Sequence, residues 1–146
     1  MKTPYDAALR ALDQEMDELK RVIRDAMERL TAIEAERKAI GKRIVEEQQL
    51  STENHILFAD AYLARARQQR ASLDDAQRTA EQELSMLREK AAEQFASMRA
   101  IGNAADQYRQ NVERERERAE QQLVDDVVAA RFVRTMRHAR DRKRQS

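Results

Sequence analysis

The sequence has no cysteine and no tryptophan, one proline and two glycines, and only 4% of its residues are aromatic. Without cysteine the chain has no disulfides, no thiol nucleophile and no thiolate metal ligands. Two isolated glycines, Gly41 and Gly102, cannot form a glycine-rich phosphate-binding loop. The scarcity of aromatic residues argues against a thick globular core, whereas a seam between two helices needs only one apolar stripe on each helix.

Long apolar runs are also missing. No stretch approaches the roughly 18 consecutive apolar residues of a membrane-spanning helix, and the residues after Met1 lead into no apolar segment of a secretory signal. Together with the lack of cysteine, this predicts a soluble cytoplasmic protein. A length of 146 residues predicts a single domain, 1–146.

Residues for catalysis or metal binding do not occur at the required spacings. The two histidines, His55 and His138, lie far apart in the sequence, and neither has a second metal-binding residue at ligand spacing. Carboxylates are abundant but fall on solvated helix faces, and a catalytic pair needs a desolvated cleft to shift its pKa values. We therefore expect no enzymatic activity, no metal and no cofactor.

Charged residues make up 38% of the chain, and the apolar residues between them follow a helical repeat. Thr3, Pro4 and Asp6 form the start of a first helix over about 4–48, with Thr3 as N-cap, Pro4 at the first helical position and Asp6 at a capping-box spacing. Ten of eleven positions in the alternating three- and four-residue series are apolar, which is typical of a coiled coil. The series is Leu9, Leu12, Met16, Leu19, Ile23, Ala26, Leu30, Ile33, Arg37, Ile40 and Ile44.

The repeat breaks at 48–54, where Ser51, Thr52 and Asn54 favour a turn. We predict a connection at 49–54 and a second helix over about 55–138, followed by a basic tail at 139–146. A short connection joins antiparallel neighbours, so the expected fold is all-α, a long antiparallel two-helix coiled coil or helical hairpin. The alternative is one continuous rod that dimerises.

The second helix has a weaker repeat that is rich in alanine. Fifteen of nineteen positions between Ile56 and Ala119 are apolar, and a four-residue step to Leu123 then resembles a stutter. A turn at 49–54 pairs the first helix with the second only as far as about residue 99, which leaves a C-terminal helix overhang. Gly102 lies where this cover ends, and either a kink or an ordinary exposed helical glycine fits that position.

Charge is distributed unevenly along the chain. Residues 131–146 carry seven Arg or Lys and one acid, a balance of +6, so a net charge of +1 leaves −5 for residues 1–130. Arg131, Arg134 and Arg137 follow one another at three-residue spacing. A solvated tail, a docking element for an acidic protein surface, and a contact with nucleic acid or anionic membrane are the open interpretations.

Two further groups are candidate partner contacts. Phe58 and Tyr62 lie one helical turn apart beside the predicted seam, either as a small core at the tip or as an exposed anchor for a partner. Asp125 and Asp126 form an adjacent acidic pair with apolar neighbours on both sides, although chemistry alone assigns them no more than an exposed helix face.

Three short motifs lie at 58–63 with 67–69, at 87–90 and at 122–131. They are an aromatic-led start of the second helix with a later glutamine-rich stretch, a hydrophobic-Arg-Glu-Lys segment, and a C-terminal segment similar to hydrophobic-Asp-Glu-x-Ala-x-Arg, in which Asp126 replaces glutamate and Val128 replaces alanine. These motifs resemble the flagellar export protein FliJ family. Aromatic residues that are usual in the latter half of the family's first helix are absent.

The resemblance implies a helical hairpin similar to the central stalk of rotary ATPases, without enzymatic activity of its own. It implies a role in the flagellar type III export apparatus, at the cytoplasmic face of the inner membrane. The expected partners are the hexameric export ATPase, the export gate membrane protein and export chaperones, with the termini at the ATPase and the tip at the gate. A generic coiled-coil scaffold or adaptor is the alternative function, and a helix that associates with nucleic acid or membrane is a third.

Overall fold

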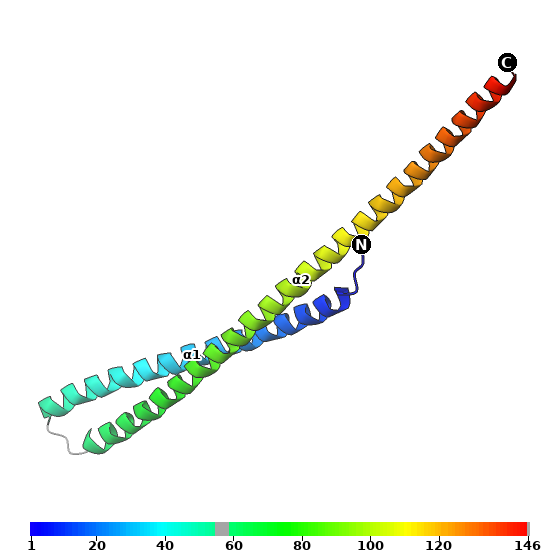
Figure 1. The fold of residues 1–146 in the computed structure, drawn as a ribbon. Coiled ribbons are helices and arrows are strands. Elements are labelled where there is room, and N and C mark those ends of the chain that lie inside the picture. Colours follow the sequence, from blue (N-terminus) through cyan, green and yellow to red (C-terminus); the bar gives the residue numbers. More distant parts are fainter. Residues whose placement is uncertain (55–58, 146) are drawn as a thin grey trace. The chain divides into compact units, whose positions relative to one another are not determined.

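The computed structural model describes residues 1–54 and 59–145, without the side chains of 51–54 and 59. It contains two long α-helices, α1 over Asp6–Asn54 with 49 residues and α2 over Ala59–Gln145 with 87 residues (Figure 1). No strand occurs in these two ranges. The chain divides into two compact units, one formed by Arg10–Arg99 and the other by Met1–Leu9 with Ala100–Ser146.

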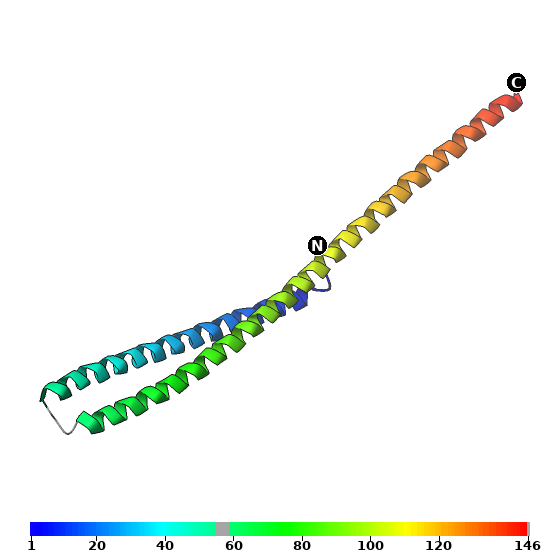
Figure 2. The same cartoon turned by 60° about the vertical axis from the view of Figure 1, so that its left-hand side comes forward.

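The unit Arg10–Arg99 is an antiparallel helical hairpin, as the sequence predicted. The two helices lie side by side in both views (Figures 1 and 2). Arg29 on α1 forms an ion pair with Glu83 on α2 at 3.2 Å, and the later residue Arg37 pairs with the earlier residue Asp74. Because the later residue of α1 contacts the earlier residue of α2, the two helices run antiparallel.

The seam between the helices consists of the predicted apolar series. All eleven predicted seam positions of α1 are buried or half-buried. Near the connected end of the hairpin, two isoleucines of α1 pack with Leu63 and Ala66 of α2, and Leu73 packs against this cluster. The buried apolar residues of the hairpin are Met16, Leu19, Ala26, Ile40, Ile44, Leu63, Ala66 and Leu84.

A polar layer interrupts this apolar seam. Arg37 occupies a seam position on α1, and its guanidinium pairs with the Asp74 carboxylate and donates a hydrogen bond to the Gln77 side-chain oxygen at 3.3 Å. A polar side chain at a seam position commonly fixes the register of a coiled coil at some cost in stability. The cost is limited here because both partners of the ion pair remain partly exposed.

The connection between the helices lies later than we predicted. We placed it at 49–54, but α1 continues to Asn54 and α2 begins at Ala59. The turn-forming residues Ser51 and Thr52 are only mildly unfavourable inside a helix, so that the preceding helix can extend through them. The predicted register would have placed Arg29 opposite residue 75, whereas it contacts Glu83, about two helical turns further along α2.

In the other unit, the N-terminal segment covers the part of α2 that begins at Ala100. Ala105 is only 1% exposed, and Ile101 and Val112 are half-buried. The predicted limit of cover near residue 99 is therefore wrong, and the uncovered part of α2 begins after Val112. α2 is helical through Gly102, where no atom lies within 4 Å of the position that a β-carbon would occupy, so packing does not require glycine there.

The basic C-terminal residues belong to α2. We predicted that the second helix ends near 138 and that 139–146 is a tail, but the helix extends to Gln145. Three basic residues, Arg142, Lys143 and Arg144, occupy its last turn. Positive charge at a helix C-terminus interacts favourably with the partial negative charge of the unpaired carbonyl groups, which explains the extension.

We predict that the register can be fixed by crosslinking in this cysteine-free chain. Arg29→Cys combined with Glu83→Cys should crosslink within one chain through a short bifunctional thiol reagent, because the two side chains meet across the helices. Arg29→Cys combined with Asp75→Cys is the control for the register that a turn at 49–54 would produce. Gel mobility and intact mass distinguish crosslinks within one chain from those between chains. Efficient crosslinking of the Asp75 pair, or crosslinks only between chains, would contradict the hairpin register described above.

Candidate partner-binding surfaces

The C-terminal surface, defined as residues 113–145 of α2, is exposed along its entire length. It belongs to the unit formed by Met1–Leu9 and Ala100–Ser146. An isolated helix gains little stability from backbone hydrogen bonds alone, and most helices in proteins depend on packing of an apolar face. A fully exposed helical segment of this length is therefore a candidate for contact with another molecule.

Large apolar side chains are concentrated on this surface. Phe132 is 64% exposed and Leu123 is 65% exposed, in contrast to the seam leucines Leu19 and Leu84 at 6%. Single exposed apolar residues are ordinary, but a contiguous group marks an interaction site. The group comprises Leu123, Val124, Val127, Val128, Phe132, Val133 and Met136, all about half exposed or more.

The predicted stutter residues form no intramolecular seam. Leu123, Val127 and Ala130 were expected to continue the apolar repeat after a four-residue step, and all three are exposed. The seam of α2 ends at Val112, because α1 has no residues left to pair with the following turns. The apolar repeat beyond this point has no mate within the described part of the chain.

The three predicted arginines lie beside these apolar residues. Val127, Arg131 and Arg134 follow at four- and three-residue spacing, which places them on one face of a helix. Arg137 borders a shallow groove on the helix surface, together with Phe132 and Met136. The side chains of this surface can therefore offer cationic and apolar contacts to the same partner.

The predicted acidic pair lies on the same surface. Asp125 and Asp126 are both exposed, and one Asp125 carboxylate oxygen accepts a hydrogen bond from the Gln121 side chain at 3.0 Å. The pair thus precedes the arginines by about two helical turns on the same helix. The structure brings Asp125, Asp126, Arg131, Arg134 and Arg137 together on one continuous exposed segment.

Of the remaining predicted contacts, Tyr62 falls in the hairpin unit. Phe58 lies outside the described residues. Tyr62 is 38% exposed and lines a small depression with Ile40, Arg43 and Ala66. Its ring is thus partly packed against the seam and partly accessible, so both the core and the anchor interpretations of this residue retain support.

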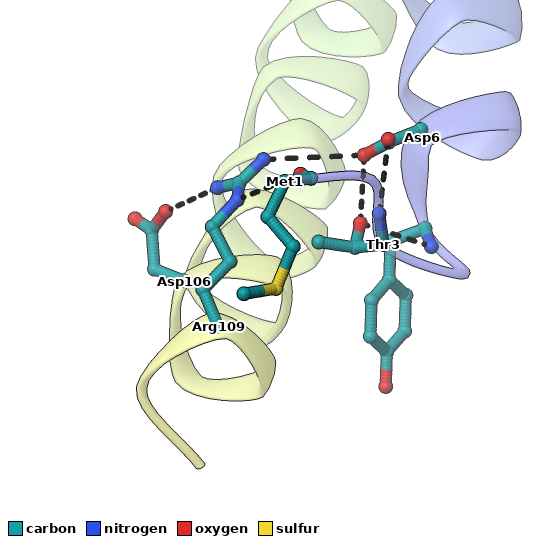
Figure 3. Close-up of polar contacts among 6 residues, drawn as sticks. Met1, Thr3, Asp6, Asp106 and Arg109 are labelled. Atoms are coloured by element: carbon teal, nitrogen blue, oxygen red, sulfur yellow. Dashed lines mark hydrogen bonds and ion pairs between the residues drawn. The ribbon is translucent and has the colours of Figure 1, made fainter. Parts of the chain in front are cut away.

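A polar cluster at the N-terminus was not predicted in full. The expected capping box is present: the Asp6 carboxylate accepts from the Thr3 backbone N–H at 3.0 Å and from its hydroxyl at 2.7 Å, and the Thr3 hydroxyl accepts from the Tyr5 N–H (Figure 3). Thr3 is buried, at 8% exposure. The unpredicted member is Arg109 of α2.

Arg109 connects the N-terminal segment to α2. Its Nε donates to the Met1 carbonyl oxygen at 3.4 Å, one terminal nitrogen lies 4.0 Å from the Asp6 carboxylate, and the other contacts Asp106 at 2.8 Å (Figure 3). Sequence periodicity could not identify this residue because Arg109 lies next to a seam position, where long charged side chains are common. Its partners depend on the register, which the predicted turn had placed incorrectly.

Among residues 1–54 and 59–145, no group of three or more His, Cys, Asp or Glu is arranged to hold a metal ion. In the same ranges, neither helix is both long and apolar enough to cross a membrane. No protein-family model, curated protein or solved structure matches the chain.

We predict that Arg109→Ala loosens the N-terminal segment. Amide hydrogen exchange of residues 5–9 should accelerate by up to about fivefold, since partly exposed ion pairs contribute up to ~1 kcal/mol. Arg116→Ala is the matched control, because Arg116 is also on α2 but pairs with the neighbouring Glu113, at 4.0 Å. Equal exchange of residues 5–9 in both variants and the original protein would show that Arg109 does not hold this segment.

Proposed function

We propose that this protein is a non-catalytic, partner-binding component of a flagellar type III export apparatus. In this proposal the C-terminal surface binds the hexameric export ATPase. The hairpin tip contacts the membrane protein of the export gate, and the helices also receive export chaperones. The resemblance of three sequence motifs to the FliJ family supplies the identity of the partners, and the geometry of α2 supplies the surface.

The contrast between the two parts of α2 carries the proposal. As far as Val112, the apolar seam positions of this helix are mostly buried or half-buried. From residue 113 onward, the helix presents apolar side chains of comparable size with no cover. Long helices with a paired and an unpaired portion are suited to binding, because the unpaired portion buries its apolar face only when a partner is present.

The charge of the C-terminal surface favours a protein partner of acidic character. Arg131, Arg134 and Arg137 flank the apolar group, and arginine forms geometrically specific, bidentate hydrogen bonds with carboxylates. Charges of this kind mainly set the rate and orientation of association, whereas the buried apolar residues supply most of the affinity. An oligomeric ring that surrounds the helix could engage several of its faces at once.

We predict that Arg131→Glu, Arg134→Glu and Arg137→Glu in one chain abolish stimulation of the export ATPase. The variant should also bind at least about tenfold more weakly, a loss of ~1.4 kcal/mol, because three attractive charges become repulsive toward an acidic surface. Raising the salt concentration should weaken binding of the original protein. The ATPase rate is measured at increasing concentrations of this protein or its variant. A direct titration measures the binding of each to the ATPase.

The matched control changes three other arginines of the same helix. Arg114→Glu, Arg116→Glu and Arg118→Glu alter the net charge by the same amount and also lie on the exposed segment, but away from the large apolar side chains. This control should retain most of the stimulation. If the first triple variant stimulates as well as the original, the C-terminal surface is not the ATPase-binding element. If neither the original protein nor the control variant binds the ATPase, a general scaffold function gains support instead.

We predict a separate role for Tyr62 at the other candidate surface. Tyr62→Ala should weaken binding to the export gate and reduce motility, with little loss of helicity. Tyr108→Ala is a close control, since Tyr108 lies on the same helix and is also 38% exposed. Thermal unfolding separates the two interpretations of Tyr62, because truncation of a fully buried aromatic residue costs about 3–5 kcal/mol. A loss of that size with unchanged gate binding would make Tyr62 a core residue.

A further inference from the structure

We infer that two copies of this chain pair in antiparallel orientation through their C-terminal surfaces, centred on Ala130. The exposed apolar group extends to both sides of this residue, with Leu123, Val124, Val127 and Val128 before it and Phe132, Val133 and Met136 after it. A second copy in antiparallel orientation presents the same apolar group in reverse order. Leu123, Val127 and Val133 lie on the same face of the helix as Ala130, so both copies can bury these side chains along a contact about 20 Å long.

Charge selects the orientation of this pairing. Residues 117–126 carry four acids and one arginine, a balance of −3. Residues 134–143 carry four arginines and one lysine against one acid, a balance of +4. In an antiparallel pair the acidic segment of each copy faces the basic segment of the other. In a parallel pair like charges would face each other along the whole contact, which is unfavourable.

Individual residues match at this register. In this register, a residue a given number of positions before Ala130 in one copy lies at the same height along the contact as the residue that number of positions after Ala130 in the other copy. Asp126 is therefore level with Arg134 of the other copy, Glu120 with Arg140, and Glu117 with Lys143. In the same way Val127 is level with Val133, and both lie on the same side of the helix as Ala130. All these side chains are exposed in the single chain, so the pairing requires no unfolding.

The inference is independent of the proposed export function but concerns the same surface. A second copy and a ring partner would compete for the apolar group of residues 123–136. Self-pairing would then cover part of this group when the partner is absent, which reduces the aggregation hazard of an exposed apolar patch. The self-association test uses the purified chain alone, so failure of the ATPase proposal leaves its outcome unaffected.

Two charge-reversal variants test the role of these segments. The first carries Arg134→Glu, Arg137→Glu and Arg140→Glu, and the second carries Glu117→Lys, Glu120→Lys and Asp126→Lys. Sedimentation equilibrium should give the original protein a concentration-dependent mass of up to twice its 17.0 kDa. Each variant alone should be monomeric, because its two facing segments now carry the same sign. Circular dichroism at the same concentrations verifies that each variant remains helical.

A mixture of the two variants should restore a dimer. The unchanged acidic segment of the first variant faces the unchanged basic segment of the second, and the two reversed segments also have opposite signs. In a parallel pair the segments of the original protein would repel each other, so a dimer of the original protein together with this recovery is expected only for antiparallel pairing. A monomeric original protein, self-association of either variant at the original strength, or failure of the mixture to recover would each overturn the inference.

Single cysteines in the otherwise cysteine-free chain test the centre of the pairing. Ala130→Cys should form a disulfide-linked dimer on mild oxidation, because the two copies of this residue are level. Ala119→Cys alone should not, whereas Ala119→Cys mixed with Asp141→Cys should link the two different chains. These substitutions leave the large apolar side chains intact, so the test does not depend on whether the charge variants fold. Efficient self-linking through Ala119→Cys would indicate a parallel dimer and overturn the inference.

Discussion

The apolar seam between α1 and α2 is the interaction on which the described structure depends. Within the hairpin, each helix has an apolar stripe with a few polar positions, and the two stripes pack against each other. With only two helices, every remaining face is in contact with solvent. The candidate contact surfaces of the described residues therefore lie on the outer helix faces and at the ends of the seam.

The seam also determines where the binding surface begins. α1 has 49 residues and α2 has 87, so a large part of α2 has no counterpart in α1. The N-terminal segment extends the cover to Val112, where Arg109 and the Thr3–Asp6 cap hold it against α2 (Figure 3). The apolar group around Ala130 lies beyond the covered part of α2 and is exposed. The same group serves both inferences, contact with a ring-shaped partner and pairing with a second copy.

Polar residues within the seam limit its strength and refine its register. Arg37 pairs with Asp74 and Gln77, which makes any shift of one helix along the other unfavourable. Gln94 also occupies a seam position of α2, and its side-chain oxygen is buried without a hydrogen-bond partner. Such a group costs about 1–3 kcal/mol. The hairpin thus gives up some stability at a few positions while retaining a single alignment.

The sequence by itself determined the helical class, the two apolar series and the N-terminal cap, because these depend on local spacing and on hydrogen bonds between residues a few positions apart. It also located the exposed arginines and the acidic pair on α2. Tertiary structure decided the end of α1 at Asn54 and hence the register, the contacts of Arg109 and the start of the exposed segment after Val112. Ser51 and Thr52 only weakly disfavour a helix, so α1 can extend through them. A shift of a few residues in the turn then moves every contact across the seam by about twice that number.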